Sequence, residues 1–155
     1  MKKFVSAIGI LLLLATGFAA AQQPPATPQA AAQSAAGAIE PNAVRDAAQR
    51  VAMAMDAGQA AKLWDEASVV TRKSVTRDAF IAGISKARQP LGKATGRNWV
   101  SVRRQAGDGK ALPSGLYASV EFLVEFAGKR TMRELVSFRL DEDGTWRFSG
   151  YVVQP

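Results

Sequence analysis

The spacing of hydrophobic residues changes once along the chain, from a helical period to an alternating one. In the first half, apolar residues recur every three or four positions, as they do on the buried face of a helix. This spacing predicts three helices, over residues 41–57, over residues 59–67, and over a segment that begins at Thr76 and ends at Pro90. Gly58 suits the left-handed residue that follows the first helix.

In the second half, apolar and polar residues alternate, which is typical of strands with one buried face. The alternation predicts four strands, over residues 98–104, 116–126, 130–140 and 145–153. The result is an α+β fold, in which three N-terminal helices pack on a curved four-stranded antiparallel sheet. Gly150, inside the last strand, has no side chain to pack and predicts a bulge or a bend.

The alternation also assigns side chains to the two faces of the sheet. Glu134 shares a strand face with apolar residues, so this carboxylate is expected to point towards the helices. By parity Tyr117 lies on the opposite face of its strand, and Tyr151 lies opposite Trp146 and Phe148. The convex side of the sheet is then expected to carry an apolar patch suited to a homodimer or a protein partner, formed by Tyr117, Leu123, Leu135, Tyr151 and Val153.

The N-terminal residues have the composition of an export signal followed by a tether. Residues 1–21 combine two lysines, an apolar stretch over residues 8–14 and a small-residue site that ends at Ala21, which predicts a cleaved signal peptide. We therefore expect a periplasmic or secreted protein without a transmembrane anchor after cleavage. Residues 22–40 are rich in Gln, Pro and Ala and predict a disordered arm, which leaves residues 41–155 for a single domain.

The composition excludes several kinds of chemistry. The chain contains neither cysteine nor histidine, so disulfides, thiol catalysis, His-dependent triads and metal sites built on thiolate or imidazole are excluded, and we expect no metal or cofactor. The formal net charge is +7, and residues 72–104 carry nine basic residues against Asp78 alone. This block is either a solvated face or a patch for an anionic envelope polymer or lipid, with the candidates Arg72, Lys73, Arg88, Arg97, Arg103 and Arg104. Trp99 near Arg103 and Arg104 is the single tryptophan of this block, and a nucleic-acid partner is not expected for an exported chain.

Short motifs spread over the domain resemble the domain-of-unknown-function family 4019. They are Trp64 with Ser68, the Pro90-Leu91-Gly92 segment ahead of Arg97, Pro113 with Gly115 and Tyr117, Glu134, and the segment DGTWRFSGY at residues 143–151. The resemblance covers roughly residues 45–153. It implies a small exported bacterial protein with a cone-like fold similar to cystatin and nuclear transport factor 2, and it implies no activity.

Glu134 is the residue best suited to a chemical role. A carboxylate on the helix-facing side of the sheet is either paired with an arginine, for example Arg88 or Arg97, or available as a catalytic base or a ligand-orienting group. Trp64, Tyr117 and Tyr151 are further ligand-binding candidates, with core packing or an interface as the alternative.

Three functions are compatible with these residues. The first is a non-enzymatic binding domain of the envelope that acts through its sheet. The second is a cone-type pocket for a small ligand, with or without isomerase-like chemistry at Glu134. The third is electrostatic attachment through residues 72–104.

Overall fold

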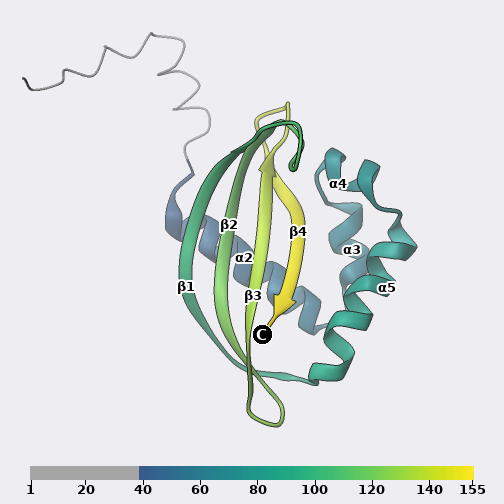
Figure 1. Ribbon diagram of the computed structural model, residues 1–155, viewed down its shortest axis with the longest axis vertical. Coiled ribbons are helices and arrows are strands. Elements are labelled where there is room, and N and C mark those ends of the chain that lie inside the picture. The colour runs from purple at the N-terminus through teal and green to yellow at the C-terminus, as the bar shows by residue number, and fades with distance from the viewer. Residues whose placement is uncertain (1–38) are drawn as a thin grey trace, which may run out of the picture.

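The helices of the computed structural model lie on one face of a four-stranded sheet (Figure 1), in a structure that describes residues 39–155. The helices are α2 (Pro41–Asp56), α3 (Ala60–Asp65), α4 (Val69–Ser74), α5 (Arg77–Arg88) and the 3-10 turn η1 (Gln89–Leu91). The strands are β1 (Ala94–Gly107), β2 (Gly115–Phe126), β3 (Arg130–Leu140) and β4 (Trp146–Gln154). The predicted signal peptide and residues 22–38 of the predicted arm lie outside the described residues.

Helix α2 begins and ends at residues that suit those positions. The backbone N–H of Ala43 donates to the Glu40 carboxylate at 2.8 Å, and Pro41 occupies the first turn, where no backbone donor is needed. After Asp56 the chain leaves the helix through Gly58, whose φ of +71° is readily adopted by glycine. The buried face of α2 crosses β1, β2 and β3 and consists of Val44, Ala48, Val51, Ala52 and Met55.

The prediction of three helices is wrong, because α4 is an additional helix between α3 and α5. Its sequence carries adjacent valines and no apolar residues at helical spacing, so the periodic pattern gave no signal. Contacts with β4 hold it instead. The N–H of Ser68 donates to the carbonyl of Phe148 at 2.8 Å, and the Thr71 hydroxyl donates to the carbonyl of Ser149 at 3.0 Å. Tertiary contacts therefore form a helix that propensity alone does not favour.

The sheet has the order β1-β2-β3-β4, and every neighbouring pair is antiparallel, as predicted. The bounds of the last three strands agree with the prediction to within one residue. Strand β1 extends beyond the predicted residues 98–104 at both ends, to Ala94 and Gly107. The extra residues are small or polar, and they are held by pairing with β2 rather than by an apolar pattern of their own.

A bulge in β4 corrects the predicted side-chain faces at the end of the chain. Ser137 pairs with Gly150 whereas Phe138 pairs with Phe148, so Ser149 is one residue extra on this strand. The predicted bulge at this position is confirmed. Beyond it, the faces assigned to Tyr151, Val152 and Val153 are reversed. Tyr151 pairs with Val136 on the helix side, and Val152 is 47% exposed on the outer side.

The outer face of the sheet is consequently less apolar than the sequence pattern indicated. Tyr117 lies on this face, as predicted, but it is buried and its hydroxyl donates to the carbonyl of Pro113 at 3.0 Å. Glu121 on the same face contacts Arg133 and Arg103. Of the five residues predicted to form the apolar patch, only Leu123 and Leu135 remain on this face with exposed surface.

The core lies between the inner face of the sheet and the helices. It contains the inward residues of β2 and β3 together with the apolar faces of α2, α3 and α5, and Phe80 packs edge-to-face on Phe148 with ring centroids 5.9 Å apart. Within residues 39–155, no helix has the length and apolar character needed to cross a membrane.

Candidate ligand-binding cleft

A buried carboxylate in the middle of this core is held by two arginines. Glu134 of β3 has no exposed surface, and it accepts from Arg97 of β1 through Nε at 2.5 Å and through Nη2 at 3.3 Å. Arg88, in the last turn of α5, donates from Nη1 to the same carboxylate at 2.9 Å. The ion pair that the sequence favoured for Glu134 is therefore confirmed, and it involves both of the arginines named.

A second carboxylate, Asp56, closes the cluster at the last turn of α2. It lies 3.1 Å from Nη1 and Nη2 of Arg97 and contacts Nη2 of Arg88. The Tyr151 hydroxyl donates to Glu134 at 2.6 Å and accepts from Arg88. Two guanidinium groups thus face two carboxylates, so the formal charge of the four groups is zero. The arginine side chains are 10% and 11% exposed, whereas Asp56 is 28% exposed.

Arg97 and Tyr151 both have raised pKa values in this cluster. Burial lowers the pKa of Arg97, but the hydrogen bonds and opposite charges of Glu134 and Asp56 together outweigh it, so the pKa is raised. Burial raises the pKa of Tyr151, and the neighbouring Glu134 carboxylate raises it further, so the phenol stays protonated. The Arg88 guanidinium also lies 5.4 Å from the ring centroid of Phe126 and 5.6 Å from that of Tyr151.

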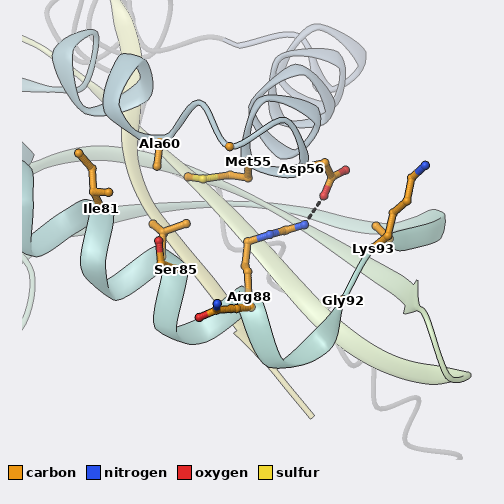
Figure 2. A pocket seen from close by; sticks show the side chains of 12 residues that line it. Met55, Asp56, Ala60, Ile81, Ser85, Arg88, Gly92 and Lys93 are labelled. Carbon is orange, nitrogen blue, oxygen red and sulfur yellow. Dashed lines mark hydrogen bonds and ion pairs between the residues drawn. The ribbon is translucent and has the colours of Figure 1, made fainter.

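Arg88 and Asp56 form part of the lining of a cleft of about 660 Å³, which Figure 2 shows. One wall is the junction of α2 and α3, and the other is the helix α5 with the segment that leads into β1. Arg88 reaches from α5 across to Asp56 on the opposite wall (Figure 2). Most of the remaining lining is apolar or small, with Met55, Ala60, Ile81, Ile84 and Ala94 as its hydrophobic residues and Lys93 as a further cation.

The structure brings together two of the four predicted ligand-binding candidates. Glu134 and Tyr151 belong to the cluster beneath the cleft, whereas Trp64 and Tyr117 lie elsewhere. The indole N–H of Trp64 donates to the carbonyl of Val75 at 3.1 Å, so this side chain joins α3 to the start of α5. Sequence reasoning missed Asp56. Its position at the negative end of the helix dipole, where an acid is unfavourable, was the signal that could have identified it.

The six basic candidates do not form one surface. Arg88 and Arg97 point into the cluster and are nearly buried, which contradicts their place in an exposed patch. Arg72 donates to the carbonyl of Asp65, and Arg103 lies 3.6 Å from Glu121 on the outer face of the sheet. Lys73 lies on α4 and Arg104 on β1. The dense run of charge in the sequence is thus divided between the interior and separate parts of the surface.

A second charged cluster surrounds Asp141 at the turn between β3 and β4. Ser68 donates to this buried carboxylate at 2.5 Å, Arg139 at 2.9 Å and Arg147 at 3.2 Å. Burial raises the pKa of Asp141, but these donors outweigh it and the net pKa is lowered. The cluster joins the start of α4 to the β3–β4 turn, so it accounts for Ser68 and for part of the DGTWRFSGY segment as architectural residues.

Metal-ligating side chains do not gather anywhere in the part of the chain that the structure describes.

Residues 47–151 match the model of the family described as "Protein of unknown function (DUF4019)". Because this match spans most of the chain, the protein belongs to that family, as the sequence motifs indicated. No curated protein and no solved structure matches the chain.

Proposed function

We propose that this member of the DUF4019 family is an exported, non-enzymatic binding domain that takes a small ligand into the cleft between α2, α3 and α5. The main support for this proposal is the cleft itself, whose volume of about 660 Å³ lies in the range of small-molecule sites. Its apolar walls and a small number of charged groups are the combination that such sites use for affinity and orientation. Export is proposed from the signal-like residues 1–21.

Binding without catalysis is supported by the state of Glu134. A general base must have a lone pair free to accept a proton from the substrate. Both oxygens of Glu134 accept from arginines, one also accepts from Tyr151, and the carboxylate does not line the cleft. Isomerase-like chemistry at this residue would first require the cluster to open.

The other two functions have less support. The outer face of the sheet remains a candidate for a partner or a second copy, but the bulge and the loop over Tyr117 remove three of the five residues predicted to form its apolar patch. Attachment through residues 72–104 lacks two of its six cations, because Arg88 and Arg97 are committed to internal carboxylates. Neither the change on the outer face nor the internal pairing of the two arginines weakens the case for the cleft.

A variant that fills the cleft tests the proposal. Ser85 is an exposed residue of α5 that lines the cleft, whereas Ala82 is exposed on the same helix and does not. The protein is expressed in a bacterial host from the full chain, recovered from the envelope and the medium, and analysed by native mass spectrometry and by NMR with a small-molecule library. We expect library members to shift cleft signals in the wild type and in Ala82→Trp and to leave Ser85→Trp unaffected.

Two results would contradict the proposal. One is a library that shifts no cleft residue at millimolar concentration. The other is a set of binders that Ser85→Trp and Ala82→Trp retain equally, because a tryptophan at position 85 occupies the proposed site. The same cultures test export, since a protein of unprocessed mass that stays in the cytoplasm argues against it. Analytical ultracentrifugation of the same samples tests the sheet, because a stable dimer would restore that face as the main interaction surface.

A further inference from the structure

We propose that the cleft binds a small amphipathic carboxylate, and that the ligand carboxylate replaces Asp56 on Arg88 and Arg97. The inference rests on the proposed binding function and names the chemical class of its ligand. It also gives Asp56 a role, as an internal counterion that occupies the ligand position when the cleft is empty.

A carboxylate already occupies the proposed ligand position beside Arg88 and Arg97. Asp56 Oδ2 lies 3.1 Å from Nη1 and from Nη2 of Arg97, so one carboxylate oxygen accepts charge-assisted hydrogen bonds from both nitrogens. Arg88 contacts the other oxygen from the opposite wall of the cleft. A ligand carboxylate in the same place would keep every one of these donors paired.

The two carboxylates of the cluster differ in burial and in their place in the fold. Glu134 is fully buried on a central strand and balances one of the two guanidinium charges. Asp56 balances the other, but it is 28% exposed and lies in the last helical turn, next to Ala57 and Gly58. Helix ends open more readily than central strands, and an acid there also opposes the helix dipole. Asp56 is therefore the member of the cluster that a competing anion can displace.

The rest of the cleft lining is mostly apolar, with one further cation. Its hydrophobic lining residues can cover an apolar ligand body, and burial of each methylene contributes to affinity. Lys93 adds positive charge at the cleft, and it forms no ion pair with a carboxylate of residues 39–155. The site thus combines an anion position with an apolar wall, which matches a carboxylate attached to a short hydrocarbon chain.

Isothermal titration calorimetry with three probes of equal chain length tests the ligand class. The probes are octanoate, octan-1-ol and octyltrimethylammonium, titrated into the protein expressed from the full chain. We expect octanoate to bind at least about tenfold more tightly than octanol, because only octanoate can accept charge-assisted hydrogen bonds from both arginines. Octyltrimethylammonium should not bind. Octanoate and octanol of equal affinity would overturn the carboxylate assignment while leaving the cleft as a ligand site.

A charge-matched pair of variants tests the displacement of Asp56. Asp56→Asn removes the competing charge, so octanoate affinity should rise by about fivefold to tenfold, on the order expected for one half-buried charge pair. Asp46→Asn makes the same change in net charge on the same helix, where Asp46 pairs with Arg45, and it should leave the affinity unchanged. An unchanged or weaker affinity in Asp56→Asn, or an equal gain in both variants, would overturn the displacement.

A measurement on the wild type keeps the inference testable if Asp56→Asn does not fold. The Nε–H signals of arginine are resolved in NMR spectra, and those of Arg88 and Arg97 should shift with octanoate and not with octanol. Binding of octanoate that leaves both signals in place would overturn the proposal. Absence of binding by both octanoate and octanol would count against the proposed function itself, so the two failures are distinguishable.

Discussion

Replacement of Glu134 by glutamine should be among the most destabilising single changes of charge in the domain. The carboxylate is fully buried and accepts three hydrogen bonds from Arg88 and Arg97 and one from Tyr151. Glutamine keeps the size of the side chain but leaves two nearly buried guanidinium groups with Asp56 as their single counterion in the cluster. Removal of one partner from a buried ion pair typically costs 3–5 kcal/mol. We expect a loss of about 3 kcal/mol, because the partly exposed Asp56 compensates for some of the charge.

Urea unfolding followed by circular dichroism measures this loss as a lower midpoint at unchanged slope. Glu125→Gln is the matched control, because Glu125 lies on the adjacent strand β2 and is exposed, and its replacement should change the stability by less than about 0.5 kcal/mol. A triple replacement of Glu134, Arg88 and Arg97 by methionine should recover much of the stability, since no buried charge is then left unpaired. A loss below about 1 kcal/mol in Glu134→Gln would refute the reasoning, because it would mean that water reaches the cluster.

Two further predictions concern the other end of the β3–β4 hairpin. The folded pKa of Asp141 is lowered, so its contribution to stability is present above its ordinary pKa and is lost as the pH falls through the folded value. Asp141→Asn should therefore be less stable than the wild type at pH 7, with a difference that narrows below about pH 4 in urea titrations; a constant difference would contradict the assignment. Gly115→Ala places a Cβ about 3.0 Å from the Arg139 guanidinium at a φ of +145°, and it should cost about 2 kcal/mol in thermal unfolding. Gly128→Ala, at φ +83° in open space, should cost less, and equal costs would show that the contact with Arg139 contributes nothing.

Much of the fold could be predicted because one apolar period dominates each half of the chain. The inward residues of β2 and β3 were assigned correctly, since nothing interrupts their alternation between Gly115 and Leu140. The ion pair of Glu134 followed from the same alternation, because a carboxylate on an apolar face needs a cation and arginines were close in the predicted topology. These predictions depend on local pattern, which the sequence displays directly.

The predictions that failed depend on contacts between distant residues. Helix α4 exists because Ser68 and Thr71 bond to β4, almost eighty residues further along the chain. Tyr151 was assigned to the outer face because a period of two was continued through the extra residue Ser149. Gly150 indicated that a bulge was present, but its effect on the faces of residues 151–153 could be read only from the pairing with β3. Asp56 was missed because its partners come from α5 and β1.

The bulge in β4 places Ser149 between helix α4 and the arginine cluster around Glu134. Its carbonyl accepts from Thr71 of α4, and its presence as an extra residue turns Tyr151 towards Glu134. If the unchanged strand paired with β3 without this bulge, strict alternation would place Val152 rather than the tyrosine at the buried carboxylate. Removal of Ser149 would make the strand regular and keep Gly150 opposite Ser137, so the tyrosine would stay on the helix side. The place of Tyr151 in the arginine cluster therefore depends on how β4 pairs with β3, and not on which side chain residue 149 carries.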